Sequence, residues 1–101
     1  METYPIVDTG AAYCLFSGDR TARLGLELLS GRPTKFSLVS GVVAAYLHEI
    51  AIEIEGHRFL VEVAFSSGPI RRELLGRHSL FEQTTWGIRE SRQEIYFSQH
   101  P

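Results

Sequence analysis

A carboxylate follows a short apolar stretch and precedes a small, flexible turn in the segment Ile6-Val7-Asp8-Thr9-Gly10. A carboxylate in such a place is costly to bury unless hydrogen bonds reach it, and a threonine hydroxyl and nearby backbone amides can supply them. An aspartate held in this way can exchange a proton with a substrate or with water, as general acid–base catalysis requires. Structural turns use the same residue types, so the triplet alone leaves both a catalytic and a structural role open.

A second motif lies far downstream, where an apolar pair is followed by glycine and arginine in Leu74-Leu75-Gly76-Arg77. Between the two motifs, residues 36–46 are apolar and β-branched around Gly41, which predicts a hairpin with its tip near Ser40-Gly41. This order resembles that of the retropepsin-like aspartic proteases, and residues 76–81 are more similar to their bacterial branch. In that family an apolar-apolar-Asp-Thr-Gly-Ala element carries the catalytic aspartate. A flap hairpin follows, and an apolar-apolar-Gly-Arg element lies beneath the catalytic loop.

The resemblance implies a mostly β fold: a closed barrel with a flap hairpin and one or two short helices, in a single domain over residues 1–101. It assigns catalysis to Asp8 and support of the catalytic loop to Thr9 and Gly10. Contacts with the substrate fall to Ala11, Gly41 and Val42. The structural motif comprises Leu74, Leu75, Gly76 and Arg77. No metal and no other cofactor is implied.

The aspartates limit what one chain can do. The sequence holds two, Asp8 and Asp19, and Asp19 is not followed by a Thr-Gly or Ser-Gly pair. Peptide hydrolysis by acid–base chemistry needs one carboxylate to activate water and a second, protonated one to donate to the carbonyl oxygen. One chain therefore supplies half of a dyad, and the resemblance implies a homodimeric endopeptidase that acts on polypeptides only as a dimer. Two alternatives stay open: an inactive module of the same fold that dimerises or holds a peptide by strand addition, and one half of a larger pseudo-symmetric protease.

The chain departs from the family pattern at three places. Seven residues precede Asp8, where family members usually carry one or two further strands, so N-terminal strands are expected to be missing. Ala12 stands where viral members have an acidic residue, so Arg77 is expected to lack that partner. The flap is richer in alanine and valine than in glycine.

Composition excludes several other classes of function. With 101 residues, a formal net charge of −2 and 44% hydrophobic residues, the chain is expected to fold, and it lacks the basic field of dedicated nucleic-acid-binding proteins. Its longest apolar run is far shorter than the roughly 20 residues that span a bilayer, so no membrane partner is expected. The histidines lack metal-ligand spacing, and Cys14 is expected to be a small buried hydrophobe. One cysteine fits a reducing compartment, so a cytoplasmic location is expected.

Strands must position these motifs. Strict alternation is clearest over residues 49–55 and 59–65, which predicts a hairpin that turns at Glu55-Gly56-His57. Residues 4–7 and 12–16 are predicted as short strands on either side of the Asp8 turn. A turn or two of helix is expected between Arg20 and Leu29, and a short helix around residues 79–83 with Ser79 as its N-cap. Two further strands are predicted over residues 85–89 and 94–97.

Overall fold

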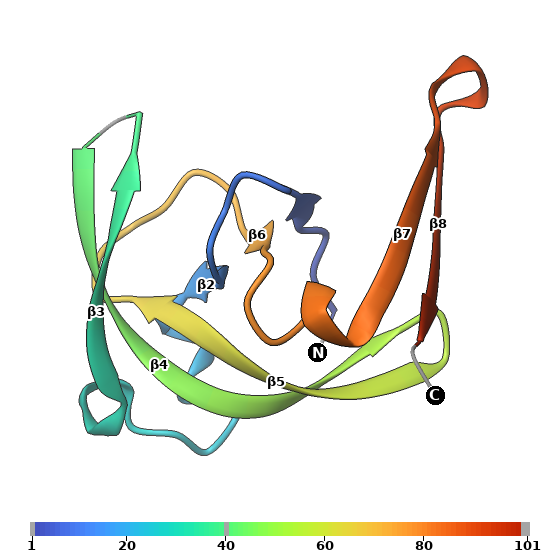
Figure 1. The fold of residues 1–101 in the computed structure, drawn as a ribbon. Coiled ribbons are helices and arrows are strands. Elements are labelled where there is room, and N and C mark those ends of the chain that lie inside the picture. Colours follow the sequence, from blue (N-terminus) through green and yellow to red (C-terminus); the bar gives the residue numbers. More distant parts are fainter. Residues whose placement is uncertain (1, 40, 100–101) are drawn as a thin grey trace.

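The computed structural model describes residues 2–39 and 41–99, whose strands form a six-stranded sheet and a separate two-stranded hairpin (Figure 1). The strand order in the large sheet is β1-β6-β2-β5-β4-β3. Its strands are β1 (Ile6–Val7), β2 (Cys14–Ser17), β3 (Arg32–Leu38), β4 (Gly41–Ile54), β5 (His57–Ser66) and β6 (Leu74–Leu75). The separate hairpin consists of β7 (Thr84–Arg89) and β8 (Glu94–Gln99), joined by the 3-10 turn η4 (Glu90–Arg92).

The longest ladder joins β4 to β5, as the alternating pattern predicts. β5 buries Phe59, Val61 and Val63 and leaves Leu60 exposed between them. Glu55 and Gly56 turn between the strands with φ angles of 50° and 79°, the positive values that two-residue hairpin loops need. The prediction of this hairpin and of its turn is therefore confirmed.

Apolar side chains pack on both faces of the large sheet, because successive residues of a strand point to opposite faces. One cluster contains Cys14, Phe16, Phe59, Val61, Val63, Phe65, Leu75 and Leu80. The other contains Leu15, Phe36, Ala45, Leu47 and Ala64. The strands β2 and β5 contribute to both clusters, so they form the middle of the fold and anchor the shorter strands beside them.

The second predicted hairpin is formed by β3 and β4, whose ladder runs from the pair Arg32 and Leu47 to the pair Leu38 and Gly41. Gly41 has a φ of 131°, which L side chains rarely adopt. Ser40, the other residue of the expected tip, lies outside the described residues. The free end of this hairpin lies on the same side of the molecule as the β1–β2 loop and the end of the β7–β8 hairpin (Figure 1).

The short helices expected from the sequence are single 3-10 turns in the described part of the chain. Between Arg20 and Leu29 the structure has the ends of two such turns, η1 (Gly18–Arg20) and η2 (Leu28–Ser30). Gly25 between them has a φ of 72°, which interrupts a right-handed helix.

The helix expected around residues 79–83 is the 3-10 turn η3 (Phe81–Gln83). Ser79 has a φ of 72° and does not cap this turn. Its hydroxyl instead accepts a hydrogen bond from the backbone N–H of Glu62 (3.1 Å), so a contact distant in sequence replaces the expected local one.

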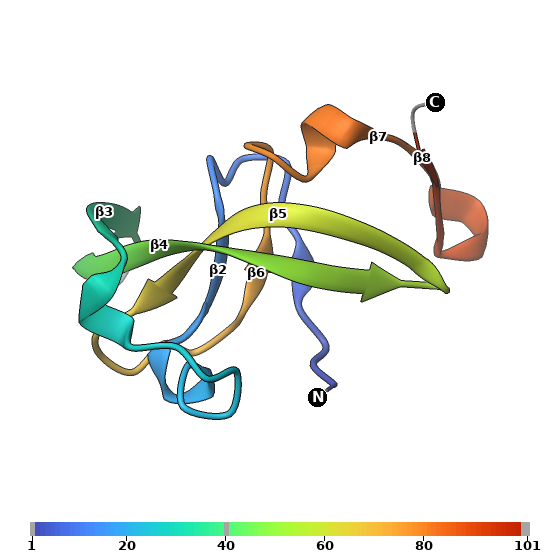
Figure 2. The same ribbon diagram turned by 90° about the horizontal axis from the view of Figure 1, so that it is seen from below.

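The large sheet does not close into the expected barrel within the described residues. Its two edge strands, β1 and β3, each pair with one neighbour and not with each other. β1 and β6 have two residues each, too few to build a further ladder across to β3. Figure 2 shows the long strands β4 and β5 running across β2 and β6. The architecture is therefore an open, strongly curved sheet that positions the β1–β2 loop at one end.

Candidate active site

The Asp8 loop folds around its own carboxylate. Asp8 directly follows β1, and its backbone N–H donates to the carbonyl of Leu75 (2.9 Å). Its Oδ1 atom accepts a hydrogen bond from the N–H of Gly10 (2.9 Å), and its carbonyl accepts one from the N–H of Ala11 (3.1 Å). A Cβ on Gly10 would lie 3.3 Å from Oδ1, so glycine allows the amide to approach. Asp8 is half-buried, and within the described residues its Oδ2 atom accepts no hydrogen bond.

The segment Leu74–Gly76 holds this loop from below. β6 lies between β1 and β2, parallel to β1 and antiparallel to β2. After it, the N–H of Arg77 donates to the carbonyl of Ala11 (3.0 Å), and the N–H of His78 donates to that of Ala12 (2.7 Å). A Cβ on Gly76 would lie 2.2 Å from the carbonyl oxygen of Tyr13, so only glycine fits under the loop. The structure thus brings the two sequence motifs into direct contact.

Two exposed residues of these motifs, Thr9 and Arg77, make few side-chain contacts. Thr9 is exposed, and its hydroxyl makes no hydrogen bond within residues 2–39 and 41–99, so the amides of Gly10 and Ala11 brace the loop instead. Arg77 is exposed as well, and none of the ion pairs between described residues includes it. Ala12 beside it offers no carboxylate, as the sequence indicates.

A cavity of about 320 Å³ opens beside Asp8. Its walls are the loop residues Asp8 and Gly10 to Tyr13, the consecutive residues 35–38 of β3, and Leu74. Ala11, one of the three predicted substrate contacts, is among the lining residues. Gly41 and Val42 do not; they lie on the hairpin, where the Val42 side chain is 67% exposed.

The β3 residues of this cavity were missed by sequence reasoning, which places the substrate contact at the hairpin tip. Their contact with the loop connects segments about 25 residues apart, which no local pattern reveals. One available signal was Lys35, the sole lysine of the chain, in an otherwise uncharged stretch from Pro33 to Leu47.

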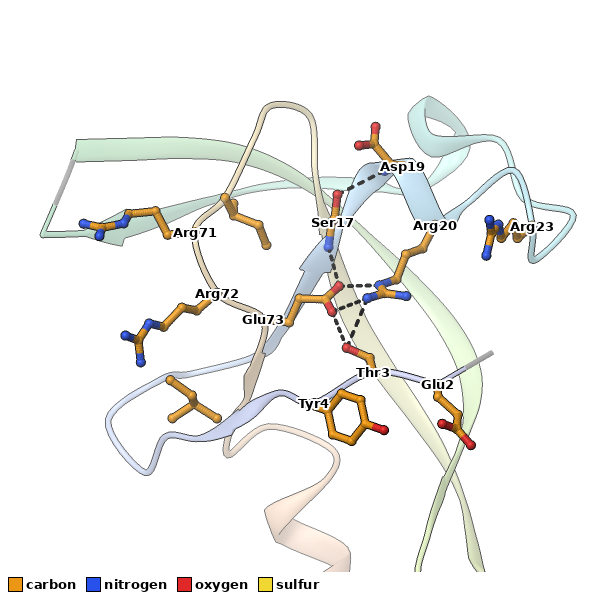
Figure 3. A pocket seen from close by; sticks show the side chains of 12 residues that line it. Glu2, Thr3, Tyr4, Ser17, Asp19, Arg20, Arg23, Arg71, Arg72 and Glu73 are labelled. Carbon is orange, nitrogen blue, oxygen red and sulfur yellow. Dashed lines mark hydrogen bonds and ion pairs between the residues drawn. The ribbon is translucent and has the colours of Figure 1, made fainter.

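A larger cavity of about 760 Å³ lies around an ion pair between Arg20 and Glu73, and Asp8 is not among its lining residues (Figure 3). Arg20 donates from Nε to Oε2 (2.5 Å) and from Nη2 to Oε1 (2.6 Å), and Glu73 also accepts from the Thr3 hydroxyl and from the N–H of Ser17. Burial alone would raise the pKa of Glu73, but these hydrogen bonds outweigh it and hold the pKa below its ordinary value. The Glu73 carboxylate is therefore engaged in joining the N-terminal segment to β2 and β6.

Cys14 does not supply a nucleophile. Its side chain is fully buried, and burial raises the pKa of the thiol to about 11. The prediction of a small buried hydrophobe is confirmed. Among the described residues, no three His, Cys, Asp or Glu side chains group as metal ligands, and no helix there is long and apolar enough to cross a membrane.

Comparison with solved structures identifies the fold. A retropepsin-like aspartic protease from Rickettsia conorii matches with a TM-score of 0.64 and 23% sequence identity, over 91% of this chain and 76% of that one. The chain has the retropepsin-like fold. The EIAV protease, solved with the inhibitor HBY-793, matches with a TM-score of 0.53 and 24% identity. That match covers 70% of this chain and 66% of the viral protease, just under two thirds of its length. No family model and no curated protein sequence matches the chain.

The resemblance stated from the sequence motifs is thus confirmed for the retropepsin-like fold, and so is its mostly β class. Within this fold the chain builds one aspartate loop, one supporting glycine segment and one hairpin beside a cavity. A carboxylate with one bonded and one open oxygen at the wall of a cavity can exchange a proton with a molecule bound there.

Proposed function

We propose that the protein is an aspartic endopeptidase, in which the Asp8 carboxylates of two copies activate a water molecule against a peptide bond. The observation that carries this proposal is the half-buried Asp8 carboxylate, held through Oδ1 by Gly10 at the wall of the 320 Å³ cavity. In this proposal residues 1–101 act as one catalytic domain in the cytoplasm, without a metal, a nucleic acid or a membrane as partner.

Two carboxylates are needed, and each chain contributes one. One carboxylate takes the proton of the attacking water while the other, protonated, donates to the carbonyl oxygen. Asp19, the other aspartate of the chain, lines the separate cavity around Glu73. The second carboxylate must therefore come from the Asp8 of a second copy, related by a twofold axis, and the monomer is inert.

The edge strand β3 offers a binding mode for the peptide. β3 is an end strand of the sheet, and four of its consecutive residues border the Asp8 cavity. An extended peptide can pair with such an unpaired strand edge through its backbone, while side-chain pockets select its sequence. Ala11 then contacts the peptide from the loop, and Gly41 and Val42 close over it from the hairpin.

The β7–β8 hairpin provides a surface for the second copy. Trp86 stacks on Phe97, with ring centroids 5.2 Å apart, and both pack against the core. Ile88 and Ile95 continue the same face of the hairpin, yet they are 67% and 52% exposed. The end of this hairpin lies on the side of the molecule that carries the β1–β2 loop (Figure 1). A copy that brings its Asp8 to the twofold axis approaches that side and covers the exposed half of this apolar face.

The proposal is tested by incubating the native chain and two variants with a library of unstructured peptides and identifying the products by mass spectrometry. Asp8→Asn is expected to lower the cleavage rate by about a thousandfold, because it removes the proton-accepting carboxylate from both halves of the dyad. Asp19→Asn makes the same chemical change outside the Asp8 cavity and is expected to cleave at the native rate. Equal rates for all three proteins contradict the proposal. Peptide binding without cleavage by the native chain favours the inactive peptide-binding module instead.

A further inference from the structure

The Asp8 cavity contains two charged side chains of opposite sign. Lys35 lies on β3, and Asp8 lies on the β1–β2 loop. The other lining residues are apolar, small or uncharged: Gly10, Ala11, Ala12, Tyr13, Phe36, Ser37, Leu38 and Leu74. Lys35 is also the sole lysine of the sequence, so this cavity holds the one ammonium side chain that the chain has.

The ammonium group of Lys35 is available to a ligand. Lys35 is exposed, and within residues 2–39 and 41–99 it makes no ion pair and no side-chain hydrogen bond. Its position is well defined, because the next residue, Phe36, is buried in the core and Lys35 itself pairs with Ala44 of β4. β3 is the end strand of the sheet, so no other strand separates Lys35 from a peptide that lies along its edge.

We infer that Lys35 determines substrate specificity by pairing with an aspartate or glutamate side chain of the bound peptide. This inference rests on the proposed function, since it names the class of substrate for that same site. A carboxylate on the β3 side of the cavity gains a charge-assisted hydrogen bond with the ammonium group. A carboxylate placed next to Asp8 is repelled, so the preference applies at peptide positions that lie along β3 and not at the bond that is cleaved.

The inference is tested with one cleavable parent peptide, in which each position in turn carries glutamate, glutamine or lysine. For each position, the ratio of kcat/KM for the glutamate peptide to that for the glutamine peptide is measured at low salt. The native protein is expected to favour glutamate at one or two neighbouring positions. Lys35→Glu is expected to lower this ratio about tenfold and to make lysine the preferred residue there, because an attractive pair becomes a repulsive one. Added salt is expected to reduce the native preference.

Arg71→Glu is the matched control. It makes the same change in net charge on an exposed residue of the larger cavity, which does not include Asp8. Its ratio is expected to equal the native one, so a change confined to Lys35→Glu excludes a general effect of net charge. Thermal unfolding of both variants shows whether they are folded; if Lys35→Glu is not, Lys35→Ala replaces it and is expected to abolish the preference without reversing it.

The failure of this inference differs from the failure of the proposed function. If the native chain and Lys35→Glu cleave with the same ratio of kcat/KM for glutamate and glutamine peptides, the inference is overturned and the proposed endopeptidase activity is not. If no peptide is cleaved, the proposed function fails, and fluorescence anisotropy of the labelled glutamate and glutamine peptides decides the inference. Tighter binding of the glutamate peptide that Lys35→Glu reverses supports it, and equal binding overturns it.

Discussion

Gly76 lies against the backbone of the β1–β2 segment so closely that a single added carbon has no room. A Cβ there would lie 2.2 Å from the carbonyl oxygen of Tyr13 and 3.0 Å from that of Ala11. Both contacts are with backbone atoms, which a rotamer change cannot move. The same backbone carries the Asp8 loop, so a shift that relieves the clash also moves the loop.

Gly76→Ala is expected to destabilise the protein by about 3 kcal/mol, because overpacking against backbone forces the strands apart. Gly87→Ala is the matched control: Gly87 is exposed on β7, its added Cβ meets no atom within 4 Å, and its effect is expected to stay within about 0.5 kcal/mol. Urea unfolding of the three proteins measures the difference. A Gly76 variant as stable as the Gly87 variant contradicts the assigned packing role.

The turn at Asp8 was predictable from the sequence because its hydrogen bonds join neighbours: Gly10 and Ala11 donate to Asp8 itself. That Lys35 and Asp8 line the same cavity was not predictable, because it depends on how segments distant in sequence pack together. The expected role of Thr9 differs from the structure, because its hydroxyl makes no hydrogen bond among the described residues. The amide of Gly10 holds the carboxylate, as the composition of the turn indicates.

At the scale of elements, a half-buried ion pair fastens the N-terminal segment to the sheet. The side chains of Arg20 and Glu73 are 28% and 12% exposed, and the pair joins η1 to the residue before β6. Thr3 takes part through its hydrogen bond to Glu73. β1 is short, and two residues of ladder hold little by themselves, so this pair is an important attachment for the strand that leads to Asp8.

Glu73→Gln is expected to lower the free energy of unfolding at neutral pH by about 2 kcal/mol, because it removes charge-assisted hydrogen bonds. The lowered pKa of Glu73 means that its stabilisation is present above the ordinary value of 4.5 and is lost as the pH falls through the lower folded value. The native protein and the variant are therefore expected to converge below pH 4.5.

Urea unfolding at neutral and acidic pH measures this convergence. Glu27→Gln is the control, because Glu27 is exposed and its side chain caps no helix turn. If the difference in free energy of unfolding between the native protein and Glu73→Gln stays constant down to low pH, the lowered pKa is not caused by the hydrogen bonds of Glu73.

Elements with local signals were predicted well, and those that depend on distant contacts were not. Alternation predicted the β4–β5 hairpin, and the two strands predicted over residues 85–89 and 94–97 correspond to β7 and β8, with boundaries close to those observed. The expected helices are shortened to 3-10 turns, because Gly25 and Ser79 have positive φ angles, and Ser79 adopts its conformation beside β5. Within the described residues the sheet of this fold stays open, and β1 at one of its ends is shorter than the predicted residues 4–7.

At the scale of the whole molecule, the proposed activity requires a dimer, and the exposed apolar half of the β7–β8 hairpin is the surface proposed to form it. Ile95→Glu places a charge on that face, whereas Ser98→Glu places one on the opposite face of the same strand. Ile95→Glu is expected to weaken dimerisation by at least about tenfold, because the charge would be buried without a partner. Ser98→Glu is expected to dimerise like the native chain.

Sedimentation equilibrium over a range of micromolar concentrations measures the dimer dissociation constants of the native chain and of the two variants. The cleavage rate per chain is expected to fall on dilution, because dimers dissociate. For Ile95→Glu this loss is expected to begin at a higher protein concentration than for the native chain. A native chain that cleaves peptides while it sediments as a monomer contradicts the half-dyad assignment.

The buried thiol beneath the loop gives the fold a further property. The Sγ atom of Cys14 accepts a hydrogen bond from the N–H of Gly76 (3.4 Å), so it lies under the same segment that supports Asp8. Its raised pKa, about 11, keeps the sulfur protonated and unreactive while β6 remains between β1 and β2. An opening that moves β6 and exposes this sulfur to an oxidant also removes the support of the Asp8 loop. Oxidation of Cys14 by this route therefore occurs only in molecules whose candidate active site has already come apart.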